Sequence, residues 1–309
     1  MFATRKPSSV TDRVTTPRVI YLGGLGRSGT TLLERLLGEL PGVVALGEVV
    51  HLWERGVRAR EPCGCGEPFP TCAFWCQVGD RAFGGWASVT ADRVLMLRRR
   101  VDRTRRIGRI AHRDLAEYVQ AYRLVYAATG ARVVIDSSKH ASLAWCLAAS
   151  GVDVHVVHVV RDPRAVAYSW GRAVARPEDG RPMTRWGPAR TALHWTAQNA
   201  ALELLARRGA RVTTVRYEDL LAAPERTLTG LVRALGLAAV PELPFVDGQT
   251  AWLGPSHTVS GNPMRFHVGR VELRRDDAWT TGLGAGERRL VDALTWPLRA
   301  RYGYSGVTG

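Results

Sequence analysis

A short glycine-rich segment near the start of the chain has the residues of a phosphate-binding loop. It follows the apolar run Val19–Leu22, precedes a leucine-rich stretch, and consists of Gly26, Arg27, Ser28, Gly29, Thr30 and Thr31. Glycines let such a loop turn tightly, so backbone N–H groups and the positive end of the following helix point at one anion. In a Walker frame that begins at Gly24, the lysine position is Thr30, and the cation is Arg27 instead. The loop therefore predicts that the chain binds a nucleotide whose leaving group differs from that of a kinase reaction.

Three further motifs follow in the chain. An apolar run ends in Arg161, and Ser169 stands eight residues later. Segment 215–220 contains Tyr217, and segment 260–266 contains Arg265. The order of the four motifs, over roughly residues 18 to 300, resembles that of sulfotransferases that use 3′-phosphoadenosine-5′-phosphosulfate (PAPS).

The resemblance implies roles for these residues. Arg161 and Ser169 would bind the 3′-phosphate of PAPS, with Arg265 as a candidate third ligand. Tyr217 would stack near the adenine, although a tyrosine at a strand end is as often part of the core. Arg27 and the amides from Ser28 to Thr31 would hold the 5′-phosphate. The product would be 3′,5′-adenosine diphosphate, and no metal is expected.

Glu48 is the first candidate for the base that accepts the acceptor's proton, and His51 is the second. Glu48 follows a short apolar run, 43–46, and the pair Gly47-Glu48 looks like the Gly-Glu segment of tyrosylprotein and related bacterial sulfotransferases. The family's glutamate aligns either with Glu48 or one residue later, at Val49. Partial burial at a strand end would raise the pKa of Glu48.

Lys139 is one of only two lysines in the chain, and it follows a predicted strand in the segment Asp136–His140. By resemblance its ammonium would contact the transferring sulfonate. The alternative is that Asp136 caps the next helix and Lys139 is solvated.

The alternation of apolar and helical segments predicts an α/β fold, a parallel β-sheet flanked by helices. The resemblance implies that this is the P-loop-like sulfotransferase fold. Phosphate loops then lie at the carboxyl ends of strands, where such sheets bind ligands. Residues 18–309 are expected to form one domain after a disordered tail, 1–17. The expected strands are 18–23, 43–46, 132–135, 152–160 and 211–216, and the expected helices are 29–40, about 91–128, 141–149, 163–174, 190–208 and 225–236.

The formal charge of +15 raises the question of nucleic acid. The cations are almost all arginine and are scattered, and no docking motif is present, so nucleic-acid binding is disfavoured. The densest basic segment, 98–109, is interpreted either as a solvated helix face or as the rim of the site, where it would attract an anionic acceptor or PAPS. No apolar run approaches the ~18 residues of a membrane span, and a cytoplasmic protein is expected.

Four cysteines, Cys63, Cys65, Cys72 and Cys76, lie within fourteen residues. Their spacing lacks the paired C-x2-C pattern typical of zinc sites. Reduced structural thiols are favoured, and disulfides or zinc stay open as alternatives.

The sequence as a whole predicts an enzyme that moves a sulfuryl group from PAPS to a hydroxyl, or less readily an amine, of a small molecule or carbohydrate. The rivals are a P-loop nucleotide-dependent kinase and a basic nucleic-acid-binding protein. The acceptor pocket is expected from segments 51–128 and 172–195, with Trp170, Trp186 and Trp195 as candidate walls.

Overall fold

The computed structural model describes residues 16–104, 112–175, 180, 182–237 and 243–304. The predicted tail, 1–17, lies almost wholly outside these residues. So do 105–109 of the basic segment and part of the polar loop around residue 180.

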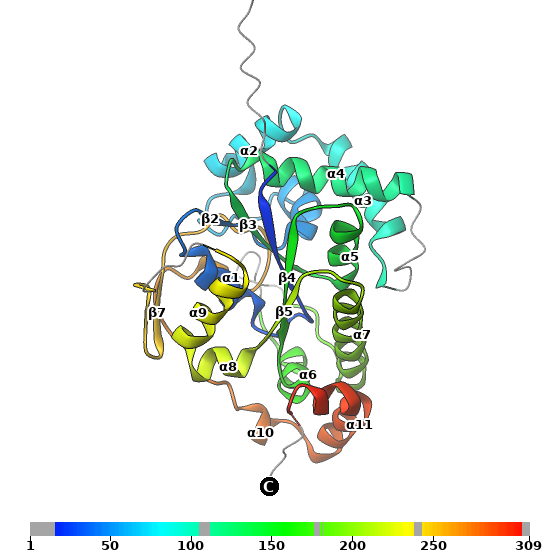
Figure 1. Ribbon diagram of the computed structural model, residues 1–309, viewed down its shortest axis with the longest axis vertical. Coiled ribbons are helices and arrows are strands. Elements are labelled where there is room, and N and C mark those ends of the chain that lie inside the picture. Colours follow the sequence, from blue (N-terminus) through cyan, green and yellow to red (C-terminus); the bar gives the residue numbers. More distant parts are fainter. Residues whose placement is uncertain (1–15, 105–111, 176–179, 181, 238–242, 305–309) are drawn as a thin grey trace, which may run out of the picture.

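A parallel sheet with the order β2-β3-β1-β4-β5 forms the centre of the described structure (Figure 1). Its strands are β1 Arg18–Gly23, β2 Val43–Ala45, β3 Val133–Lys139, β4 Val154–Val160 and β5 Val212–Arg216. Because β1 pairs with both β3 and β4, the glycine loop after β1 leaves from the middle of the sheet. The predicted fold class, a parallel β-sheet flanked by helices, is confirmed.

Side chains of β1 alternate between two apolar clusters, as the pleat of a strand requires. Val19 and Tyr21 are buried in one cluster, and Ile20 and Leu22 in the other. The first cluster includes side chains of α2 Ala73–Phe83, α3 Ser88–Val101, α4 His112–Ala128, α5 Ala141–Ala149 and α7 Pro188–Arg207. The second includes those of α1 Thr30–Gly38, α8 Tyr217–Ala222 and α9 Pro224–Ala234.

Smaller elements complete the described chain. Near the end of the sheet where β4 finishes lie α6 Pro163–Gly171, α10 Trp279–Gly282 and α11 Ala285–Arg301 (Figure 1). An antiparallel sheet consists of β6 Val246–Asp247, β7 Thr250–Leu253 and β8 Gly269–Glu272. Single turns span Val49–His51, Phe69–Thr71 and Pro263–Phe266, and a π-helix spans Leu52–Arg58. No described helix is long and apolar enough to cross a membrane.

Two predicted elements differ from the structure. The expected helix over about 91–128 is interrupted, because α3 ends at Val101 and the carboxylate of Asp102 turns inward to accept hydrogen bonds from Tyr118 (3.1 Å) and Ser142. The alternative that Asp136 caps the next helix is wrong, because Asp136 to Lys139 continue β3.

Candidate active site

A cavity of about 960 Å³ lies at the carboxyl ends of β1, β3 and β4. The predicted site residues among its lining are Gly26, Arg27, Gly29, Thr30, Thr31, Glu48, His51, Lys139, Arg161, Ser169 and Tyr217. Residues more than 180 positions apart in the sequence therefore share one space. Ser28, which is buried, and Arg265 are not part of the lining.

The glycine loop is shaped by close contacts that only glycine permits. Gly24 has φ +147°, and a Cβ there would lie 2.4 Å from the Val159 carbonyl oxygen. Gly29 has φ +90°, and a Cβ there would lie 2.1 Å from the ring of Tyr217. Gly29 is also the residue before α1, whose first N–H groups have no partner within the helix. The loop thus presents helix N–H groups to the cavity in the manner expected of a phosphate cradle.

Arg161 contacts the glycine loop and two later segments of the chain. Its Nη1 donates to the carbonyl oxygen of Arg27 (3.1 Å), and its Nη2 lies 3.7 Å from the Asp276 carboxylate. Its guanidinium also stacks 4.7 Å above the ring centroid of Tyr217. Ser169, on α6, lines the same cavity. The ring of Tyr217 is therefore held between Arg161 and the backbone of Gly29.

Glu48 forms a nearly buried ion pair with Lys139. The carboxylate is 14% and the ammonium 12% exposed, and the two groups are in hydrogen-bond contact. Burial favours the neutral acid, but Lys139, helped by Arg55, outweighs it and lowers the pKa of Glu48 to about 2. The expectation of a raised pKa is wrong, because it did not anticipate that Lys139 lies directly beside the carboxylate.

His51 lies 3.5 Å from the other oxygen of Glu48, measured from its Nε2. Burial lowers the pKa of His51 to about 3, despite the attraction of Glu48. The imidazole is therefore neutral at physiological pH and contributes no charge to the pair.

Glu34 is a positioning residue that the sequence did not single out. It is fully buried on α1, where it accepts hydrogen bonds from the Gly47 amide (2.6 Å) and the Ser137 hydroxyl (2.8 Å). Burial raises its pKa to about 7. Glu34 thereby ties the residue before Glu48 to both α1 and β3. The sequence offered one sign of this role, which is that Glu34 is an acidic residue inside the apolar run of a predicted helix.

Arg265 has a structural position. It is 1% exposed, and its Nη1 donates to the carbonyl oxygens of Pro62 (2.9 Å) and Thr258 (3.2 Å). The predicted role as a third phosphate ligand therefore does not fit this structure, because the guanidinium is committed to backbone oxygens away from the cavity.

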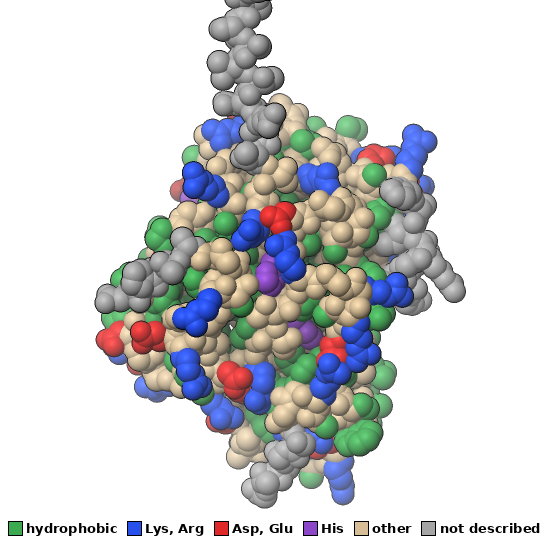
Figure 2. Space-filling view, in the orientation of Figure 1, with side chains coloured by type: hydrophobic (Ala, Val, Ile, Leu, Met, Phe, Trp, Pro, Cys, Tyr) green, Lys and Arg blue, Asp and Glu red, His purple; other side chains and the backbone are tan. Residues whose placement is uncertain are grey.

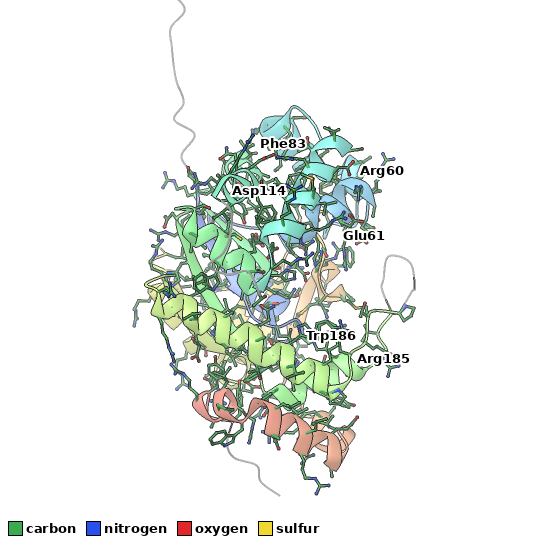
Figure 3. The ribbon with its side chains drawn as sticks, turned by 90° about the vertical axis from the view of Figure 1, so that its right-hand side faces the viewer. Arg60, Glu61, Phe83, Asp114, Arg185 and Trp186 are labelled. Carbon is green, nitrogen blue, oxygen red and sulfur yellow. The ribbon has the colours of Figure 1, made fainter. Side chains whose placement is uncertain are left out.

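Aromatic rings form one wall of the cavity. Trp170 and Trp186 stack with centroids 3.9 Å apart and 5° between their planes, and His194 stacks on Trp186 at 4.6 Å. All three line the cavity, and Figure 3 shows Trp186 beside Arg185 in the segment just before α7. The expectation for Trp195 is wrong, since it is fully buried and donates to the carbonyl of Arg161 (3.0 Å).

The basic segment, 98–109, begins within α3, and its described residues differ in their surroundings. Arg98 is half-buried and lies 3.7 Å from the Asp102 carboxylate, so the solvated-face interpretation does not hold for it. Arg103 and Thr104 line the cavity, which agrees with the rim interpretation. Over the visible face of the molecule, Lys and Arg side chains are spread among apolar and polar surface and do not gather in one patch (Figure 2).

Comparison with known proteins identifies the chain. A model described as the sulfotransferase family matches residues 91–242, which include Lys139, Arg161, Ser169 and Tyr217. Residues 91–242 of this chain therefore belong to the sulfotransferase family. The glycine loop and Glu48 lie outside the matched residues but line the same cavity as the matched ones.

Solved structures similar to this chain include sulfotransferases and sulfotransferase domains. The sulfotransferase domain of the Synechococcus olefin synthase is 19% identical, with a TM-score of 0.49, over 94% of this chain and 98% of that one. The sulfotransferase domain of the curacin biosynthetic pathway is 16% identical, with a TM-score of 0.49, over 90% and 98%. Sulfotransferase STF1 of Mycobacterium tuberculosis is 19% identical, with a TM-score of 0.44, over 74% and 70%. No curated protein matches the chain.

Proposed function

We propose that this sulfotransferase uses PAPS as its donor and transfers the sulfuryl group to a hydroxyl of a small molecule or carbohydrate. The observation that carries the proposal is that one cavity combines the glycine loop, the Arg161 and Ser169 pair, and the Glu48–Lys139 ion pair. In the reaction, the bond from sulfur to the bridging phosphate oxygen breaks, a bond from sulfur to the acceptor oxygen forms, and the acceptor's proton passes to a base. 3′,5′-Adenosine diphosphate is the other product.

The residues at the donor end of the cavity fit a polyanion. The lining carries more cations than acids, with Arg27, Arg55, Arg103, Lys139, Arg161 and Arg274 against Glu48, Asp102 and Glu272. The N–H groups at the start of α1 suit the 5′-phosphate, and Arg27 suits the charge that develops on it. Arg161 and Ser169 suit the 3′-phosphate, a group that ATP lacks. Thr30 in place of the Walker lysine argues against the kinase alternative.

Glu48 is the proposed base, and Lys139 controls its protonation. While the two are paired, the low pKa makes Glu48 a weak proton acceptor. If the ammonium of Lys139 turns to a bound sulfonate, the buried carboxylate of Glu48 loses its main partner. Burial then raises the pKa of Glu48. Through Lys139, Glu48 would thus become a better proton acceptor only when the donor is bound.

The aromatic wall of Trp170, Trp186 and His194 is the proposed acceptor side. Stacked rings favour an acceptor with an apolar or sugar-ring face. Two further predictions from the sequence, a single domain over residues 18–309 and a cytoplasmic location, stay predictions.

Parallel incubations with one acceptor library test the proposal. The library includes aliphatic alcohols, sugars and amines, and it receives either sulfur-labelled PAPS or γ-phosphate-labelled ATP with magnesium. We expect label to move from PAPS to a hydroxyl acceptor without added metal. Transfer of labelled phosphate from ATP, with none from PAPS, would support the kinase instead.

A further inference from the structure

A second group of chemically reactive side chains lies away from the cavity. The Sγ atoms of Cys63, Cys65 and Cys72 and a ring nitrogen of His257 all lie within 4.8 Å of one another. The loop with the cysteines follows the π-helix, and Figure 3 labels Arg60 and Glu61 between the two. His257 comes from a segment about 190 residues later in the chain.

We propose that these four side chains bind one structural Zn²⁺ ion. Three cysteines and one histidine are a ligand set of closed zinc sites. With Zn–S near 2.3 Å and Zn–N near 2.0–2.1 Å, a tetrahedron places two sulfurs about 3.8 Å apart and a sulfur and a nitrogen about 3.6 Å apart. The Sγ atoms of Cys65 and Cys72 are 3.8 Å apart, and Nδ1 of His257 lies 3.8 Å from the Sγ of Cys63 and 3.4 Å from that of Cys72.

The surroundings of the four ligands support a built site. The ring of Phe74 stacks on His257 with 5.0 Å between centroids and 12° between planes, and the indole of Trp75 donates to the His257 carbonyl (2.8 Å). Cys72 immediately precedes α2, so the positive end of that helix faces a thiolate at this position.

The spacing pattern considered ligands only among the four nearby cysteines. The thiol of Cys76 instead donates to the Pro70 carbonyl (3.2 Å), and His257 completes the set. No local sequence pattern connects a histidine so far along the chain to the cysteine loop.

The ion would fasten the cysteine loop to a wall of the active site. The Gly64 amide already donates to the Thr258 carbonyl (2.9 Å), and a Cβ on Gly64 would lie 2.6 Å from the Thr258 hydroxyl. One residue further, the Val259 carbonyl accepts a hydrogen bond from the Glu48 amide (2.8 Å). Zinc at this place would stabilise the backbone that holds Glu48 without touching the reacting atoms.

Metal analysis of the full chain tests the site. Protein expressed with added zinc and purified without chelators should contain about one zinc per chain. Cys63→Ser and Cys72→Ser should lower the zinc content several-fold, whereas the matched control Cys76→Ser should keep it. Wild-type protein with less than roughly a fifth of an equivalent would overturn the proposal. So would Cys76→Ser losing as much zinc as Cys72→Ser.

Two measurements on wild-type protein keep the proposal testable where a cysteine variant does not fold. Cobalt added after removal of zinc should saturate at about one equivalent and give the intense thiolate-to-metal absorption of a tetrahedral site. Alkylation of the denatured, unreduced protein should modify all five cysteines of the chain. Two unmodified cysteines would indicate a disulfide and contradict the zinc site. Binding of cobalt without the thiolate-to-metal absorption would contradict it as well.

Discussion

Replacing Lys139 by methionine should reverse the pH dependence that Glu48 gives to stability. In the native protein, the pKa of Glu48 is lowered from 4.5 to about 2. A shift of this size corresponds to stabilisation on the order of 3 kcal/mol. Because the folded-state pKa is the lower one, this contribution is present above about pH 4.5 and is lost as the pH falls towards 2.

In Lys139→Met, burial of the carboxylate has no ammonium to oppose it, and the pKa of Glu48 moves above its ordinary value. Glu34 shows the scale of this effect, because burial raises its pKa to about 7 even with two hydrogen-bond donors on the carboxylate. Ionised Glu48 then disfavours the folded variant at neutral pH. Loss of one partner of such a pair costs about 3–5 kcal/mol, and the variant should recover much of it as Glu48 becomes protonated.

Urea unfolding at pH 7.5 and pH 5, followed by tryptophan fluorescence, measures this difference. The gap in the free energy of unfolding between wild type and Lys139→Met should narrow clearly at the lower pH. Lys139→Arg, which keeps the charge, should show a smaller gap at neutral pH. The double variant Glu48→Gln/Lys139→Met should lack the pH dependence of the single variant. An equal gap at both pH values would mean that Lys139 acts through packing and would refute the reasoning.

Three further predictions concern the cavity. Glu48→Gln should lower turnover by roughly 10²–10⁴-fold with nucleotide affinity retained, in a kinetic assay with an aliphatic alcohol as acceptor. The turnover of His51→Ala should stay within about ten-fold of wild type. The reverse pattern would assign the role of base to His51. Arg161→Ala should weaken binding of 3′,5′-adenosine diphosphate by roughly 10–100-fold and that of 5′-AMP little, and calorimetry that finds equal losses would contradict a 3′-phosphate contact. Gly29→Ala should abolish nucleotide binding and lower the melting temperature, because its Cβ would collide with Tyr217; unchanged calorimetry and melting would contradict the loop geometry.

The sequence was informative where function depends on neighbouring residues. The glycine loop follows β1 directly, Arg161 directly follows β4, and Ser169 lies on the next helix, so local patterns were enough to single them out. It was uninformative where distant residues meet. The ion pair of Glu48 with Lys139 joins two strand ends, and only the sheet order β2-β3-β1 makes those ends neighbours. The spacing of the cysteines likewise gave no sign of His257.

The most direct test of the central claim is calorimetric titration of the full chain with three nucleotides. 3′,5′-Adenosine diphosphate, without metal, should bind at least ~10-fold tighter than 5′-AMP, since the 3′-phosphate adds charge-assisted hydrogen bonds worth about 1.5–3 kcal/mol. ATP with magnesium should bind more weakly than 3′,5′-adenosine diphosphate. Equal affinities for 3′,5′-adenosine diphosphate and 5′-AMP, or tighter binding of ATP with magnesium, would contradict a PAPS-dependent sulfotransferase.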